Sequence, residues 1–179
     1  MTTATPAQMT DDLHQLSSDF TDAFNSLTLR LLGDAEPREP KALPFPQLLD
    51  YTATALELSQ NVVRLAVALA ASPEVNSREG AKAHRHLSTA ATKAISAAHL
   101  FAQSAETTLS PAPTPESHAA RTRGARLLMD CADAGAGLRR ASEELTAAIR
   151  LLEEYRAIER FSAKFLPRQP APQPPGRTP

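Results

Sequence analysis

Histidines are the first residues of this 179-residue chain that could do chemistry, because imidazole binds metals and transfers protons near neutral pH. His84 and His86 are two positions apart, which on a helix turns their side chains about 200° away from each other. They therefore cannot share a metal ion. Asp11 and His14 have the i,i+3 spacing of helical neighbours, but an aspartate at a helix start is favoured there in any case. We expect no metal ion at these residues.

The single cysteine, Cys131, excludes an intrachain disulfide and a cysteine-based zinc site. It falls on the apolar side of a predicted helix, whereas a reactive thiol usually lies at a helix N-terminus or beside cations. We interpret it as a small core residue. The chain has no Gly-x-Gly-x-x-Gly, P-loop or Gly-x-Ser-x-Gly pattern. We therefore expect neither a cofactor nor an enzymatic activity.

The nearest approach to a basic patch is a cluster of His118, Arg121, Arg123 and Arg126. At these spacings the side chains spread over more than one face of a helix, and no aromatic residues accompany them. The net charge of −1 supplies no overall attraction to nucleic acid or to an anionic membrane. An ordinary solvated face is the interpretation that we prefer, with a nucleic-acid-associated regulator as an alternative.

The C-terminal tail carries a pattern that could bind a protein. Pro172, Pro175 and Arg177 match the Pro-x-x-Pro-x-Arg arrangement that polyproline-binding domains recognise. A stiff polyproline helix loses little entropy on binding, and the arginine fixes its direction. These three residues are a candidate interaction site, and a plain spacer is the competing interpretation.

Composition favours a helical protein. The apolar residues are mainly Ala and Leu, which lead the helix scale, while Val, Ile and aromatic residues are scarce. The Ala, Arg and Pro bias suggests a high-GC bacterium, as a hypothesis about coding bias alone. The N-terminus lacks the basic start and apolar run of a signal peptide. The most apolar stretch, 62–71, is about half the roughly 20 residues of a membrane span. We expect a soluble cytoplasmic protein without membrane association.

Prolines separate four long segments with helical spacing of apolar residues. Thr10 predicts the cap of a first helix over 11–32, with Gly33 beyond its end. A second helix is expected over 46–71, and its apolar stripe is so wide that we expect it to be the most buried helix. Asn76 and Glu79 have the spacing of a capping box before a third helix that reaches Leu109.

The fourth helix is predicted from Thr114 to Leu166 and organises the rest of the chain. Thr114 and Pro115 resemble a helix start, and Pro167 ends the segment. Its seam of small residues, facing an alanine-rich seam on the third helix, predicts a tight antiparallel hairpin. Two glycines in Gly135-Ala136-Gly137 cost about 1 kcal/mol each in a helix, so we expect a kink or a break there.

The fourth helix is expected to extend past the second, leaving an apolar end that needs to be covered. Its apolar face beyond Leu152 is formed by Tyr155, Ile158 and Phe165, which are candidate interaction residues. A homodimer through this end is one way to cover it.

The sequence thus predicts an all-α fold, an antiparallel bundle of four long helices over 10–166 with a disordered leader at 1–9 and a disordered proline-rich tail at 167–179. The absence of chemical motifs favours a non-catalytic protein–protein interaction protein, such as an adaptor, regulator or assembly subunit. A small-molecule-binding bundle is an alternative, with a pocket beside His99, Cys131 or Tyr155. The identity of the partner cannot be read from these residues.

Overall fold

The computed structural model describes residues 6–32, 43–111, 114 and 117–165. Within these ranges the chain forms four long α-helices and one short 3₁₀ turn, and it contains no strand. The predicted all-α fold is confirmed. The helices are α1 (Pro6–Leu32), α2 (Phe45–Ala70), α3 (Arg78–Leu109) and α4 (His118–Phe165), and η1 (Pro73–Asn76) lies between α2 and α3.

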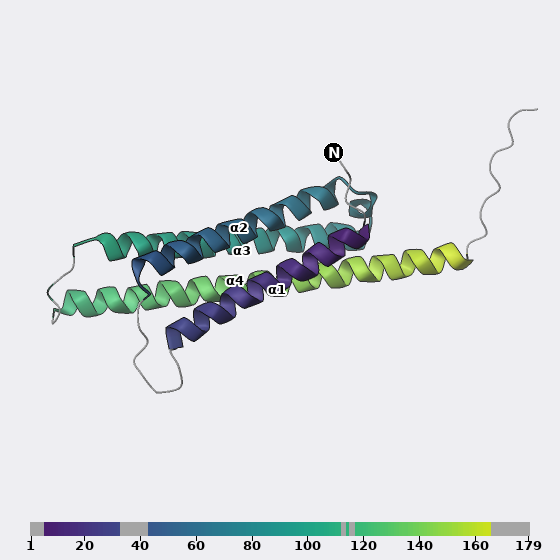
Figure 1. The fold of residues 1–179 in the computed structure, drawn as a ribbon. Coiled ribbons are helices and arrows are strands. Elements are labelled where there is room, and N and C mark those ends of the chain that lie inside the picture. Colours follow the sequence, from purple (N-terminus) through teal and green to yellow (C-terminus); the bar gives the residue numbers. More distant parts are fainter. Residues whose placement is uncertain (1–5, 33–42, 112–113, 115–116, 166–179) are drawn as a thin grey trace, which may run out of the picture.

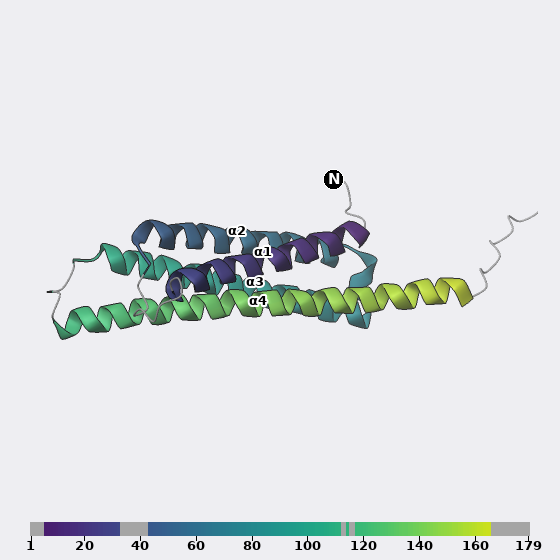
Figure 2. The ribbon, with the colours of Figure 1, turned by 60° about the horizontal axis from the view of Figure 1, so that its bottom comes forward.

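The four helices run alternately up and down, so that each is antiparallel to the next along the chain (Figure 1). Helix α3 packs on α2 along one side and on α4 along the other. Helix α1 packs mainly on α4 and more lightly on α2, and the turned view shows it between them (Figure 2). The bundle is antiparallel, as predicted.

The central helix is α3, and the prediction that the second helix is the most buried is wrong. Helix α3 is rich in alanine on both packed sides, and its small side chains let both neighbours approach. Helix α2 buries one side only. Four of the large apolar side chains that widened its stripe are exposed, namely Leu49, Leu56, Val63 and Val67.

Three helix starts differ from prediction. Helix α1 begins at Pro6, not at Asp11, because Met9 and Thr10 are buried and extend its packed face. Helix α3 is capped by the Ser77 hydroxyl, which accepts a hydrogen bond from the Gly80 amide at 2.9 Å, one residue after the expected Asn76 cap. Proline suits the first turn of α1, since its missing donor has no partner there.

Helix α4 begins at His118 instead of Thr114. The Ser117 hydroxyl accepts a hydrogen bond from the Ala120 amide at 3.1 Å, and the Ser117 amide donates to the Thr114 carbonyl at 2.9 Å. A serine at the N-cap satisfies an amide that the helix leaves free, so it competes with the upstream Thr-Pro signal. The predicted end at Leu166 agrees with the observed end at Phe165.

Helix α4 is continuous through its glycines, so of the two predicted outcomes near Gly135–Gly137 the split is wrong, and the kink stays a prediction. A Cβ at Gly135 would lie 3.0 Å from Leu27 Cδ2 of α1, and one at Gly137 would lie 3.3 Å from the Lys93 carbonyl oxygen of α3. The glycines therefore let α1 and α3 approach α4 closely. Packing on both sides offsets the intrinsic cost of glycine in the helix.

Hydroxyl groups accompany this close approach between α1 and α4. The Thr21 and Ser142 hydroxyls lie 3.0 Å apart, and the Ser142 hydroxyl donates to the Ser17 carbonyl at 3.2 Å. Between α3 and α4, His86 Nδ1 lies 2.5 Å from Glu144 Oε2. These polar contacts fix which faces of the helices meet, while the alanine and leucine core supplies the burial.

Candidate interaction surfaces

Two parallel rows of residues run along α2, one residue apart in sequence and very different in burial. The inner row, Leu48, Ala55, Val62 and Leu69, is fully buried. The outer row begins at Leu49, advances in alternate steps of four and three residues, and is exposed at every position. Its members are Leu49, Ala53, Leu56, Gln60, Val63, Val67 and Ala70.

The outer row has the spacing of a coiled-coil seam. At about 100° per residue its seven members fall within one stripe of the helix, and at 1.5 Å per residue they extend over about 30 Å. The large members Leu56, Val63 and Val67 are 43%, 44% and 64% exposed. Scattered apolar side chains are normal on a protein surface, but a row repeated over three heptads is the pattern that a partner helix fits. Sequence reasoning assigned these residues to the core.

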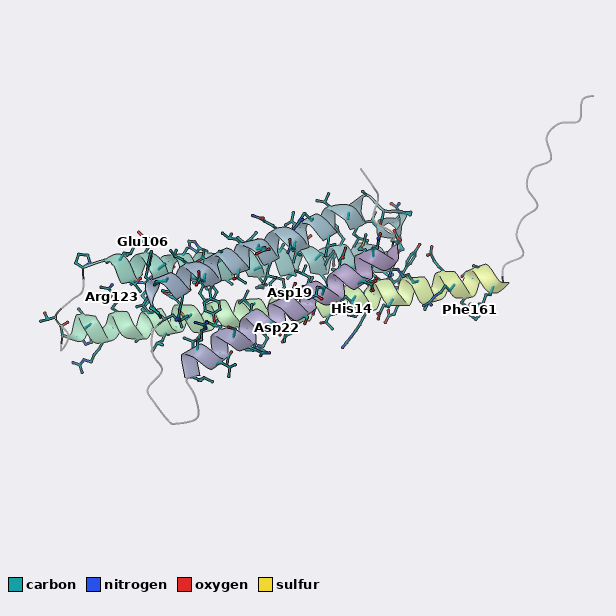
Figure 3. All side chains as sticks on the ribbon, viewed as in Figure 1. His14, Asp19, Asp22, Glu106, Arg123 and Phe161 are labelled. Carbon is teal, nitrogen blue, oxygen red and sulfur yellow. The ribbon has the colours of Figure 1, made fainter. Side chains whose placement is uncertain are left out.

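The end of α4 extends past the other helices in both views (Figures 1 and 2). Ile158 is exposed there, as predicted for a candidate interaction residue, and Phe161 is exposed on the same segment (Figure 3). Tyr155 is half-buried, and its hydroxyl donates to Glu159 Oε1 at 2.6 Å. This hydrogen bond to a carboxylate raises the pKa of Tyr155, which keeps the phenol protonated.

The other candidate residues on the C-terminal side lie outside the described part of the chain. This holds for Pro172, Pro175 and Arg177 and for the side chain of Phe165. The prediction that the tail binds a polyproline-recognising domain therefore stays a prediction.

A polar hollow of about 750 Å³ opens where the start of α1, η1 and the extended part of α4 meet. The face of α4 that carries the core as far as Leu152 continues into this hollow as Arg156, Glu159 and Arg160. Glu74 lines it and is only 8% exposed. Charged side chains replace the apolar core on this side of α4, and the apolar residues of the extended segment lie on another side of the helix.

None of the candidate metal sites is assembled within the described residues, where no group of three or more His, Cys, Asp or Glu side chains is placed to hold an ion. His14 Nε2 lies 3.4 Å from Glu153 Oε1, and His86 contacts Glu144, so both histidines link α4 to a neighbouring helix. His84 is half-buried elsewhere on α3. His14 and His86 therefore serve helix packing.

Arg123, in the middle of the arginine cluster, stabilises the end of a neighbouring helix. The Arg123 guanidinium donates to the Ser110 and Pro111 carbonyls at 3.1 and 3.0 Å and also to the Thr107 carbonyl (Figure 3). It thereby satisfies carbonyls at the C-terminal end of α3 and complements the negative end of the helix dipole. Arg126 lies 4.0 Å from Asp130 on the next turn of α4. Two of the three arginines are therefore engaged within the protein.

Cys131 lies on the packed side of α4 and is 1% exposed. Burial raises the pKa of the thiol, because the low-dielectric interior disfavours the thiolate. The nearby Ser104 hydroxyl opposes this shift in pKa, and Asp130 adds to it. A buried, protonated thiol is a poor nucleophile, in agreement with the predicted role as a core residue.

The seam between α3 and α4, where a small-molecule pocket was an alternative, is filled by close helix packing. Ala94, Ala97, Ala134 and Ala141 are almost completely buried, and the Gly137 backbone lies against α3. His99 is exposed on the surface of α3. These small residues bring α3 and α4 close together along the seam, and the small-molecule alternative stays a prediction.

No helix within the described ranges has both the length and the apolar character needed to cross a bilayer. Comparisons of the chain with protein-family models, with curated proteins and with solved structures found no match.

Proposed function

We propose that this chain is a non-catalytic protein–protein interaction protein, an adaptor, regulator or assembly subunit, that binds a helix of its partner along the outer row of α2. The observation that carries the proposal is the outer row itself. A seam with coiled-coil spacing faces solvent on a helix whose adjacent face already packs in the core.

Burial of this row would stabilise a complex. Fully burying a leucine or valine side chain contributes about 1.5–3 kcal/mol, and the large side chains of the row are roughly half exposed. Each would therefore contribute on the order of 1 kcal/mol when covered. Such a surface supports a specific contact whose strength depends on all members of the row together.

The exposed end of α4 offers a second surface. Ile158 and Phe161 are exposed on the extended segment of α4 (Figure 3), and the proline-rich tail follows this segment in the sequence. We include this end and Pro172, Pro175 and Arg177 in the proposal as a site for a different partner. An adaptor needs two separate surfaces, and α2 and the end of α4 are on different parts of the bundle (Figure 1).

Affinity capture from native lysate tests the proposal. The full chain is compared with Leu56→Glu/Val63→Glu, with a truncation after Leu166, and with Met129→Glu. Met129 is an exposed apolar residue of α4 that lies outside both surfaces, so its variant controls for added charge.

Loss of a captured protein on changing the outer row, with retention by Met129→Glu, would support the role of α2. Loss on truncation alone would place recognition on the tail. If the wild-type chain captures no protein, its own copies included, the proposal is wrong.

A further inference from the structure

The residues that flank the outer row suggest which helix it binds. One flank consists of Asp50, Glu57 and Arg64, seven residues apart and all exposed. The other flank consists of Thr52, Ser59 and Ala66, which are small and mostly buried in the bundle. A partner helix lying on the row therefore meets charged side chains on one side only.

We propose that the partner helix is α2 of a second copy of this chain, packed antiparallel to the first along the outer row. The inference rests on the proposed function and names its partner. Helices in an antiparallel coiled coil bring like flanks together, so the charged flank of one copy faces the charged flank of the other. A parallel pair would instead place each charged flank against the small, buried flank.

Charge complementarity selects one alignment of the two helices. When Leu56 lies opposite the partner's Val67, Glu57 lies beside the partner's Arg64. The two-fold axis repeats this ion pair, since Arg64 of the first copy then lies beside the partner's Glu57. A shift of one heptad in one direction places Glu57 beside its own copy and Asp50 beside the partner's Arg64, and a shift in the other direction places Arg64 beside its own copy. Each shifted alignment therefore contains a like-charged pair, whereas the proposed alignment has two attractive pairs and no like-charged one.

The row itself fits this alignment. Ala53 lies opposite the partner's Ala70, and Gln60 lies opposite the partner's Val63 in the layer beside the axis. The two Gln60 side chains then occupy adjacent layers, where their amides can bond to each other. A polar residue at the centre of an apolar seam favours the alignment that pairs it and disfavours the others.

Two features of the described structure agree with this arrangement. Within the described residues the Arg64 guanidinium bonds to the Asn61 side chain on its own helix, one turn away, and it lines a surface hollow that Asp12 and Asp19 of α1 also line. It can turn toward a new carboxylate without breaking a contact in the core. The extended end of α4 is not used, so the pair leaves it free for the second surface (Figure 2).

Sedimentation equilibrium of the full chain, over a wide range of concentrations, tests the inference. The wild-type chain is expected to dimerise. Glu57→Arg and Arg64→Glu each replace two attractive pairs by two repulsive pairs and should weaken the dimer at least about tenfold. The double variant Glu57→Arg/Arg64→Glu restores opposite charges and should return to within about threefold of wild type.

Met129→Glu is the matched control and should leave the dimer unchanged, while Leu56→Glu should abolish it. All these side chains are exposed, so each variant is expected to fold, and circular dichroism checks that it does. Failure of the double charge swap to restore the dimer would overturn the antiparallel alignment.

A wild-type chain that stays monomeric up to hundreds of micromolar would overturn the inference altogether. If that monomer still captured another protein through Leu56, the proposed function would stand with a different partner. A dimer unaffected by Leu56→Glu would place the contact between copies elsewhere and would likewise overturn the inference.

Discussion

The two rows of α2 have nearly the same residues and the same spacing but opposite environments. Leu48, Ala55, Val62 and Leu69 are buried, while Leu49, Leu56, Val63 and Ala70, each one position later, are exposed. A shift of one residue turns a side chain by about 100° around the helix. That angle separates the face that meets α1 and α3 from the face that meets solvent. The spacing of apolar residues therefore predicts that a helix has a buried face. It does not show which neighbour covers each side of the helix.

Truncating Leu48 and Leu49 to alanine should give the largest difference in stability between the two rows. Leu48 is 1% exposed, so Leu48→Ala should lower the free energy of unfolding by about 2–5 kcal/mol through lost burial and a cavity. Leu49→Ala should have a much smaller effect, on the order of 0.5 kcal/mol, because its side chain is 45% exposed in the folded chain. Leu49 also lies outside the span that the proposed antiparallel pair covers.

Urea denaturation of both variants, at a fixed protein concentration, checks this expectation. Similar losses for Leu48→Ala and Leu49→Ala would mean that the outer row is as buried as the inner row, and the comparison would fail.

The sequence predicted most of the fold because prolines and helical spacing are local signals. Helix α2 was placed to within one residue at each end, since proline at its start and the Ser-Pro turn after it determine both. The start of α4 was missed because Ser117, a better placed cap, competes with Thr114. The glycines of α4 were misinterpreted because their neighbours, Leu27 and Lys93, are distant in sequence.

The candidate site was predictable only in part. The exposed position of Ile158 followed from a change in the apolar face of α4 that is visible in the sequence. The large residues of the outer row, Leu49, Leu56, Val63 and Val67, were assigned to the core because two adjacent apolar rows look like one wide stripe. Its separate four–three spacing, from Leu49 through Val63, was the signal that could have distinguished them.

Two glycines, Gly80 and Gly124, allow the same comparison between a packed position and an open position of the backbone. A Cβ at Gly80 would lie 1.9 Å from the Glu74 carbonyl oxygen, so η1 would have to move to admit it. Gly80→Ala should therefore destabilise the protein by about 1–3 kcal/mol despite the better helix propensity of alanine. Nothing lies within 4 Å of a Cβ at Gly124, so Gly124→Ala should stabilise α4 by about 0.4–1 kcal/mol.

Thermal unfolding of the two variants gives opposite shifts of Tm if this account is right. A rise in Tm for Gly80→Ala would contradict the close contact between η1 and α3.

Thiol labelling perturbs the protein least of these experiments. It compares the reactivity of a buried position directly with that of an exposed one. Cys131 should react with a disulfide reagent only when the bundle opens, because burial both blocks the thiol and raises its pKa. In a Cys131→Ala background, Val63→Cys places the thiol on the outer row. Its reaction at low protein concentration, where the chain is monomeric, should be at least about a hundredfold faster.

The raised pKa of Cys131 also predicts how stability depends on pH. Above the ordinary pKa of a thiol, the unfolded chain loses the Cys131 proton while the folded chain keeps it, which favours unfolding. This contribution to stability is complete below the ordinary thiol pKa and is lost as the pH rises from there toward the raised value. Cys131→Ala should flatten the fall of stability over that alkaline range, measured by urea denaturation. An unchanged slope, together with fast labelling of the wild-type thiol, would mean that the α3–α4 interface is open where the structure shows it closed.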